Sequence, residues 1–280
     1  MTFLEQASKP TTDPPMLTII GTPGVGKTSL GALFPKVLFI QAEDGSAVFD
    51  SWPDEAKPDM LPRLPRARGS KGKIELSTSV RLDAYMDELI RSEHDYKTLV
   101  IDSITSLHRL FGHEITIRDG VKTVKEASGG YNNGPSEVSG MHAAFLHRCE
   151  QLRLVKGMAI VFLAHVGTRK IKNRPDQSSD FTVYTLDMDD ISSSVYISQS
   201  DAVLYLTQDQ VILGAEVDSR GKQTKMGRVM QTAQRRLITS GDGMSGFVDA
   251  KNRYEIPNQL AVEPMENPIL DYIKHFKKEN

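Results

Sequence analysis

Gly21-Thr-Pro-Gly-Val-Gly-Lys-Thr28 matches the pattern G-x-x-x-x-G-K-[ST], which is typical of loops that hold the phosphates of a nucleotide. The match lies between an apolar run at residues 16–20 and a segment from Ser29 that can continue as a helix. Glycines let successive backbone N–H groups turn inward around an anion, and the helix directs its positive end toward it. We therefore predict a binding site for ATP or GTP that consists of Gly21, Thr22, Pro23, Gly24, Val25, Gly26, Lys27, Thr28 and Ser29.

Two side chains of this loop have separate predicted roles. Lys27 is expected to reach the β- and γ-phosphates, and the hydroxyl of Thr28 is expected to coordinate Mg²⁺. A glycine-rich turn could match the pattern by chance, but the strand–loop–helix context disfavours that interpretation.

Composition describes an ordinary globular chain. Of its 280 residues, 39% are apolar and 25% are charged, which suffices for a sizeable core. No apolar run approaches membrane-spanning length, the N-terminus lacks the features of an export signal, and the single cysteine, Cys149, cannot form an internal disulfide. We therefore expect a cytoplasmic protein without a membrane partner. The net charge of −2 neither favours nor excludes a polyanionic partner.

Strand-like runs alternate with segments long enough to carry helices. The apolar runs lie at residues 16–20, 37–42, 98–101, 159–164 and 202–206, and helical periodicity is found at residues 82–90 and 138–155. This alternation predicts an α/β fold with a mostly parallel sheet and helices on both faces. Past Thr207, short segments with turns predict an antiparallel C-terminal extension of the sheet.

The domain organisation follows from the same pattern. Residues 1–15 are polar and end in a proline-rich stretch, which predicts a flexible N-terminal tail. Residues 16–280 are predicted to form a single domain.

Polar residues stand at the carboxyl ends of the predicted strands. Asp102, followed by Ser103, suits a water-mediated contact with magnesium, but no glutamate follows it to activate the attacking water. Glu43 ends the strand after the phosphate loop, where a parallel sheet would place its carboxylate beside the γ-phosphate. Glu43 is therefore the predicted general base, with Asp44 as the alternative.

His165 ends another predicted strand. A polar side chain at this position can sense the γ-phosphate and pass its presence to the loop that follows. The alternative is a strand-end histidine without a role in catalysis.

These residues together carry a family resemblance. The phosphate loop, Glu43, Asp102-Ser103 and His165 resemble the core of RecA-like P-loop ATPases, and the late segment Ala250-Lys-Asn-Arg253 adds to a narrower resemblance. More closely, the chain resembles phage nucleotide-binding single-strand-annealing proteins of the Sak group over residues 16 to 260. One departure is His165, because RecA itself has glutamine there. The resemblance implies a single RecA-like domain that hydrolyses ATP with Mg²⁺ and assembles into filaments or rings with ATP at the interface between protomers.

The resemblance also gives Lys251 and Arg253 a role. In the families that the chain resembles, such a Lys-x-Arg pair reaches the ATP of the neighbouring protomer and stabilises charge on the transferring phosphoryl group. In an extended segment both side chains leave on the same face. The alternative is a solvated basic hairpin.

In the RecA-like arrangement, two loops face the filament axis and would contact DNA. Here they are residues 118–135 and 166–184, whose basic side chains can bind phosphates and whose one aromatic can stack on a base. The predicted DNA-binding residues are Lys122, Lys125, Tyr131, Arg169, Lys170, Lys172 and Arg174. A third basic cluster is interpreted as a flexible surface loop and consists of Arg63, Arg66, Arg68, Lys71 and Lys73.

The predicted function is ATP-dependent binding of single-stranded DNA that supports annealing or homologous recombination. ATP hydrolysis is expected to require Mg²⁺ and to be stimulated by DNA, with a single-strand-binding protein as a further partner and a bacterial host cell as the location if the chain is phage-encoded. One alternative is a helicase-type or loader ATPase of DNA replication. Another is a nucleotide-dependent regulatory or scaffold protein that does not bind DNA, which the near-neutral net charge permits.

Overall fold

The computed structural model describes residues 13–171, 181–213, 216–217, 223–225, 228–240 and 249–277. In this part of the chain the strands are β1 (Met16–Gly21), β2 (Val37–Gln41), β3 (Asp59–Met60), β4 (Arg68–Ser70), β5 (Lys73–Leu76), β6 (Thr98–Asp102), β7 (Ala159–Ile171), β8 (Phe181–Leu186), β9 (Ala202–Leu213), β10 (Glu216–Val217), β11 (Gln223–Lys225), β12 (Arg228–Ile238), β13 (Lys251–Asn252) and β14 (Gln259–Val262). The α-helices are α1 (Lys27–Ala32), α2 (Thr78–Arg91), α3 (Ile104–Asp119), α4 (Asn133–Lys156), α5 (Asp190–Gln199) and α6 (Lys274–Lys277). None of the described helices is long and apolar enough to cross a membrane.

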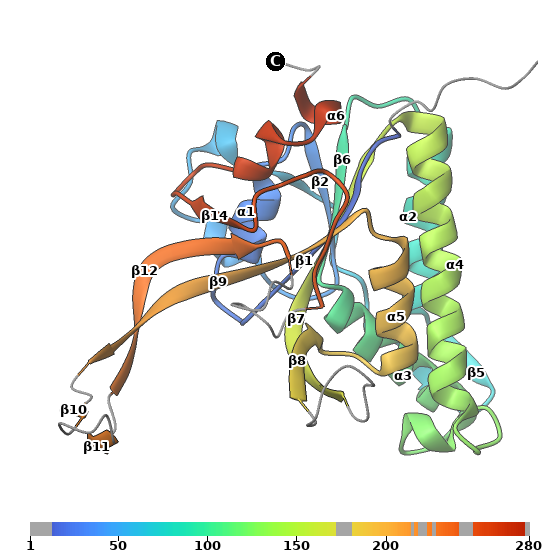
Figure 1. Cartoon of the computed structure of the whole chain (residues 1–280). Helices are drawn as coiled ribbons and strands as arrows, with labels where there is room; N and C mark the ends of the chain where they lie inside the picture. Colours follow the sequence, from blue (N-terminus) through green and yellow to red (C-terminus); the bar gives the residue numbers. More distant parts are fainter. Residues whose placement is uncertain are drawn as a thin grey trace, which may run out of the picture.

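One mixed sheet forms the centre of the molecule (Figure 1). Within the described residues its strand order is β14-β12-β9-β1-β7-β6-β2-β3. The strands from β9 to β3 in this order run parallel. β12 and β13 pair antiparallel with β9, β14 pairs antiparallel with β12, and β8 pairs antiparallel with β7. This sheet confirms the predicted α/β fold with an antiparallel C-terminal extension.

Helices cover both faces of the sheet. α2, α3, α4 and α5 lie on one face, and α1 lies on the other together with α6 (Figure 1). Side chains of β1 alternate between the two layers, because Met16 and Ile20 belong to the first core and Leu17 and Ile19 to the second. All residues of β1 are buried, which explains why its sequence is an apolar run and does not alternate with polar residues.

The register of the parallel strands brings their carboxyl ends to one edge of the sheet. Gly21 of β1 pairs with His165 of β7 and with Leu206 of β9. Gln41 of β2 pairs with Asp102 of β6. The phosphate loop after β1 and the loop after β2 therefore open at the edge where Asp102 and His165 lie.

Two strands are longer than their apolar runs predict. β7 continues past Ala164 to Ile171, and β9 continues past Leu206 to Leu213. From His165 to Lys170 the side chains of β7 are partly or largely exposed, so the apolar run ends although the strand does not. The described part of the second predicted loop, residues 166–184, is thus largely an antiparallel hairpin of β7 and β8.

The start of the described chain is bonded to the domain. The Pro14 carbonyl accepts a 2.7 Å hydrogen bond from Arg153, and the Pro15 carbonyl accepts one of 2.9 Å from the Ile160 backbone. Residues 1–12 lie outside the described residues, and the division into tail and domain stays a prediction.

Two glycines of α4 predict opposite effects on stability. A Cβ added at Gly134 would collide with the backbone carbonyl oxygen of Val124, whereas a Cβ at Gly140 meets no described atom within 4 Å. We expect Gly134→Ala to lower the free energy of unfolding by about 2 kcal/mol, because backbone must move. Gly140→Ala should raise it by roughly 0.5–1 kcal/mol through helix propensity. Urea denaturation measures both values, and equal effects would contradict the close packing of α4 on the turn at Val124.

Candidate functional site

The phosphate loop is folded around the side chain of its lysine. Lys27 is buried, and its Nζ donates hydrogen bonds of 3.0 Å to the carbonyl oxygens of both Gly21 and Thr22. Gly24 and Gly26 have φ angles of 78° and 98°, which glycine adopts without strain. Burial lowers the pKa of Lys27, and the charges of Asp102 and Glu43 oppose that shift.

A hydroxyl and a carboxylate meet next to the loop. Thr28 Oγ1 donates a 2.6 Å hydrogen bond to Oδ2 of Asp102, which is 3% exposed at the end of β6. Burial raises the pKa of Asp102, and the Thr28 hydrogen bond lowers it. Mg²⁺ prefers oxygen ligands and is commonly held by one or two protein groups together with phosphates. The pair Thr28 and Asp102 therefore fits the magnesium ligands predicted from the sequence.

Glu43 lies beside this pair and is held on two sides. Its backbone N–H donates a 3.3 Å hydrogen bond to the Asp102 carbonyl oxygen. Its carboxylate accepts a 2.5 Å hydrogen bond from Ser106 Oγ of α3 and lies 3.1 Å from Nε2 of His165. Burial would raise the pKa of Glu43, but the hydrogen bonds of His165 and Ser106 outweigh it and lower the pKa to about 2. Glu43 is thus an ionised, firmly positioned carboxylate.

His165 connects the edge of the sheet where the phosphate loop opens to the β7–β8 hairpin. Its backbone N–H donates a 3.0 Å hydrogen bond to Thr105 Oγ1, and its ring contacts Glu43. The ring atom Nδ1 is buried and has no hydrogen-bond partner among the described residues. The prediction that His165 ends a strand is wrong, because β7 continues to Ile171 as one strand of a hairpin with β8. The ring of His165 does contact the candidate base, and a role in sensing the γ-phosphate stays a prediction.

This geometry defines the class of protein. A phosphate loop after the first parallel strand, with Lys27, Thr28 and Asp102 gathered around it, is the site of a P-loop NTPase. The chain matches the AAA domain family over residues 13–254 and belongs to this family of P-loop ATPases. No curated protein matches the chain, so the narrower resemblance to RecA-like ATPases of the Sak group stays a prediction.

Lys251 and Arg253 lie at the opposite edge of the sheet from the phosphate loop. Lys251 is level with Val203 near the start of β9, and its Nζ donates a 2.7 Å hydrogen bond to the Ser198 carbonyl oxygen. Arg253 Nη1 lies 3.0 Å from Oδ1 of Asp201. Both cations thus have partners within their own chain, and a role at the ATP of a neighbouring protomer stays a prediction.

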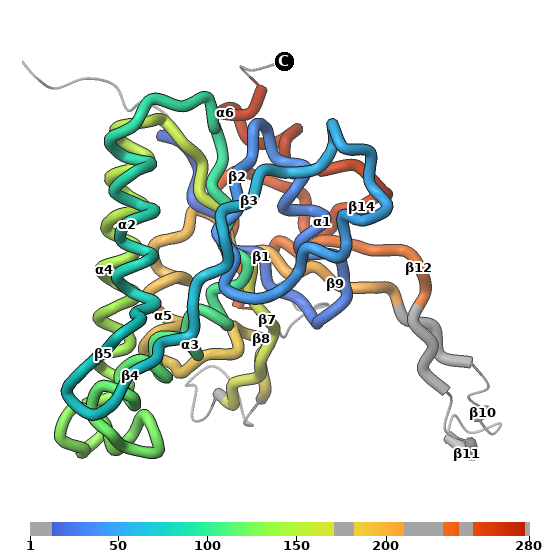
Figure 2. Tube along the Cα trace, turned by 180° about the vertical axis from the view of Figure 1, so that it is seen from behind, coloured from blue at the N-terminus to red at the C-terminus, as the bar shows by residue number. Residues whose placement is uncertain are grey.

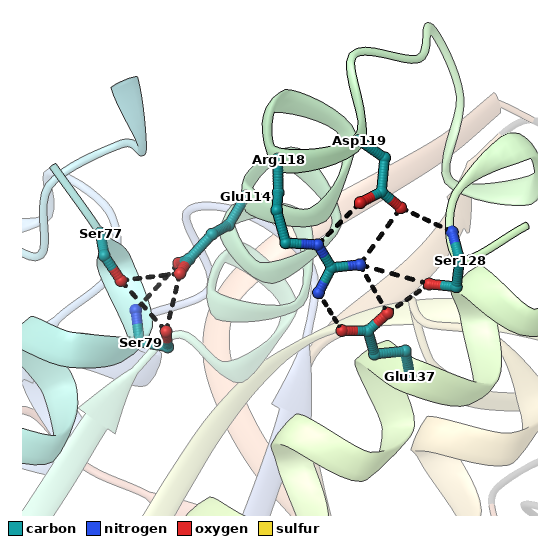
Figure 3. Close-up of polar contacts among 7 residues, drawn as sticks. All are labelled: Ser77, Ser79, Glu114, Arg118, Asp119, Ser128 and Glu137. Carbon is teal, nitrogen blue, oxygen red and sulfur yellow. Dashed lines mark hydrogen bonds and ion pairs between the residues drawn. The ribbon is translucent and has the colours of Figure 1, made fainter. Parts of the chain in front are cut away.

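The first predicted DNA loop is exposed but ordered by a polar cluster. Arg118, at the end of α3, binds Asp119 at 2.7 Å and Glu137 of α4 (Figure 3). Ser128 closes the cluster, because its backbone N–H donates to Asp119 at 2.6 Å and its hydroxyl donates to Glu137. The loop between α3 and α4, residues 120–132, is thereby fixed at both ends.

Three predicted DNA contacts project from this loop. Lys122 and Lys125 are exposed, and the Tyr131 side chain is 99% exposed. The hairpin β4–β5 carries Arg68, Lys71 and Lys73 of the basic cluster that was predicted to be a flexible surface loop, and it lies beside the loop 120–132 (Figure 2). Gly72 donates a 2.8 Å backbone hydrogen bond to Arg118. Lysines from two separate segments therefore share one end of the molecule.

The second predicted DNA loop is less available. Arg169 of β7 forms a 2.7 Å ion pair with Asp249, and Lys170 also lies on β7 with a partner of its own. Lys172 and Arg174 lie outside the described residues.

The sequence did not single out Ser106 or the polar contacts at the start of α2. Ser106 follows Ser103, the N-cap of α3, by three residues, and that spacing alone indicates only a helix start. Glu114 of α3 accepts hydrogen bonds of 2.7 Å from Ser77 and Ser79, which joins α3 to α2 (Figure 3). No motif in the sequence signals either contact, because each depends on how separate elements pack.

The lowered pKa of Glu43 predicts a pH-dependent contribution to stability. A carboxyl whose pKa is lower in the folded than in the unfolded chain stabilises the fold above the unfolded pKa, and that stability is lost as pH falls through the folded pKa. We expect the stability of the wild type relative to Glu43→Gln to decline as pH falls from about 4.5 to about 2. Chemical denaturation at several pH values measures this difference. A constant difference over that range would contradict the hydrogen bonds of Glu43 with His165 and Ser106.

Proposed function

We propose that this chain hydrolyses ATP with Mg²⁺ and that Glu43 is the general base. The observation that carries the proposal is the position of Glu43 in the loop directly after β2, where its backbone N–H is bonded to the Asp102 carbonyl oxygen at the edge where the phosphate loop opens. A carboxylate at this position can orient a water molecule toward the γ-phosphate and accept its proton. Lys27 would hold the β- and γ-phosphates, and Mg²⁺ held by Thr28 and Asp102 would neutralise charge on them.

The hydrogen bonds of Glu43 suggest how hydrolysis is held back until the site is complete. Ser106 and His165 are both hydrogen-bonded to the Glu43 carboxylate. A base with a pKa of about 2 accepts a proton poorly at neutral pH. Loss of one of these hydrogen bonds would raise the pKa of Glu43 and free an oxygen for water. The buried Nδ1 of His165 supports this role, since a phosphate or water partner there could turn the ring away from Glu43.

Variants of three residues test the chemistry. Lys27→Ala should weaken ATP binding, whereas Glu43→Gln should bind ATP and hydrolyse it at least a hundredfold more slowly. Asp44→Asn is the matched control, because Asp44 is the adjacent carboxylate and contacts Arg63 at 3.3 Å. Phosphate release and ATP affinity are measured for each variant. Unchanged turnover in Glu43→Gln would remove Glu43 from the mechanism, and a loss confined to Asp44→Asn would transfer the role to Asp44.

We also propose that the bound nucleotide controls contact with single-stranded DNA in annealing or recombination. Exposed lysines of the loop 120–132 and of the hairpin β4–β5 supply positive charge at one end of the molecule, and Tyr131 supplies an aromatic surface for a base. The Arg118 cluster supports the proposal, because a loop that is already ordered loses less entropy when it binds. A pocket of about 520 Å³ lined by His108, Lys122 and Lys125 lies under the same loop.

The proposal includes further activities and partners, and two alternative functions stand beside it. DNA stimulation of hydrolysis, self-association into a filament or ring, and interaction with a single-strand-binding protein follow from the RecA-like resemblance. A helicase-type or loader ATPase would share the nucleotide site, and a regulatory or scaffold protein would not bind DNA in a salt-dependent way.

The DNA proposal predicts a change in salt dependence. The triple variant Lys122→Ala, Lys125→Ala, Tyr131→Ala should bind single-stranded DNA more weakly. Its log–log salt slope should be smaller by about 1.4, because each lost phosphate contact removes roughly 0.7. The control is the double variant Lys36→Ala, Lys57→Ala, which removes the same amount of positive charge as the triple variant. Its two lysines precede β2 and β3, at the opposite edge of the sheet. Equal salt slopes for the triple variant and the wild type would exclude this loop as the DNA contact.

A further inference from the structure

Arg235 of β12 lies at the height of the phosphate loop although it is distant in sequence. β12 pairs antiparallel with β9, so that Leu237 is level with Leu206, which in turn is level with Gly21 at the end of β1. Arg235 pairs with Gln208, two residues further toward the carboxyl edge of the parallel strands. Its Cα therefore lies just beyond the point where the phosphate loop begins.

The side chain of Arg235 points to the α1 face of the sheet. Side chains two residues apart on a strand share a face, and Leu237 is buried in the core formed with α1. Arg236 faces the other way, where it binds Asp209 and donates a 2.7 Å hydrogen bond to Gln259. Two adjacent arginines thus have different surroundings.

The guanidinium of Arg235 reaches the phosphate loop itself. A Cβ added at Gly26 would collide with Nη1 of Arg235, so the glycine provides the space that this side chain occupies. Gly26 directly precedes Lys27 and has a φ of 98°, which excludes most other residues in any case.

The side chain of Arg235 forms no hydrogen bond or ion pair with any described residue, whereas the side chain of Arg236 forms both. A phosphate chain in the loop would supply oxygen acceptors for Lys27 and Arg235 together. A guanidinium binds such oxygens with two parallel hydrogen bonds, which an ammonium cannot do.

We propose that Arg235 binds the phosphate chain of the nucleotide held in the phosphate loop of its own chain. The inference rests on the proposed nucleotide site and adds a cation from the antiparallel extension to it. It also gives β12 a role in nucleotide binding: the phosphates would be held by β1, α1 and β12 together. The cation comes from the same chain and requires no neighbouring protomer.

The test compares Arg235→Ala and Arg235→Lys with Arg236→Ala as the matched control. Calorimetry measures the Kd of ATP and of inorganic tripolyphosphate for the full chain, and thermal unfolding without nucleotide reports on the fold. We expect Arg235→Ala to bind both ligands roughly ten- to a hundredfold more weakly, and Arg235→Lys to fall between it and the wild type. Arg236→Ala should bind both ligands as the wild type does.

Three results would overturn the inference. They are wild-type affinity of Arg235→Ala for both ligands, a loss for ATP without a loss for tripolyphosphate, which would place Arg235 on the nucleoside, and an equal loss in Arg236→Ala. Should Arg235→Ala fail to fold, Arg235→Lys decides, with weaker binding expected at an unchanged unfolding temperature. Because the readout is binding, a wild type that binds ATP without hydrolysing it would contradict the proposed function and still leave Arg235 testable.

Discussion

The hydrogen bond between Thr28 and Asp102 joins α1 to the end of β6, at the edge of the sheet where the phosphate loop opens. Thr28 belongs to α1, which follows the phosphate loop, and Asp102 ends β6, which is separated from β1 by β7. A 2.6 Å contact between them requires that α1 lie across the strand ends and that the strands stay in register. The buried carboxylate needs this partner, because a buried charge without one is costly. The phosphate loop, α1 and β6 are therefore linked at this edge of the sheet.

Electrostatic coupling extends from these linked elements to Glu43 and His165. Lys27, Asp102 and Glu43 each shift the pKa of a neighbour, so the charge of one group depends on the others. Ser106 and His165 stabilise the ionised form of Glu43 from α3 and β7. Any ligand that enters the edge with negative charge changes the balance of all these groups at once. The ionisation of Lys27, Asp102 and Glu43 is therefore coupled.

The sequence predicted features that depend on local pattern and missed those that depend on strand order. The phosphate loop, the five central strands and the polar strand ends follow from motif and periodicity. Ser106 was missed because its contact requires β6 to lie between β2 and β7, so that α3 starts beside the loop of Glu43. The course of β7 beyond Ala164 was predicted as loop because a strand with exposed side chains loses its apolar pattern. Arg235 carries no motif, and only the pairing of β12 with β9 brings it to Gly26.

The uninterrupted course of β7 has a mechanical consequence. From His165 to Ile171 the strand extends by about 20 Å at roughly 3.3 Å per residue, and β8 pairs with it over the same length. Any rotation about the His165 peptide would displace the far end of this paired ribbon more than its near end, because displacement grows with distance from the point of rotation. The amplitude of that displacement is set by the length of the hairpin. Removing whole residue pairs from the far end of the ribbon would reduce this displacement and leave the residues around the phosphate loop unchanged.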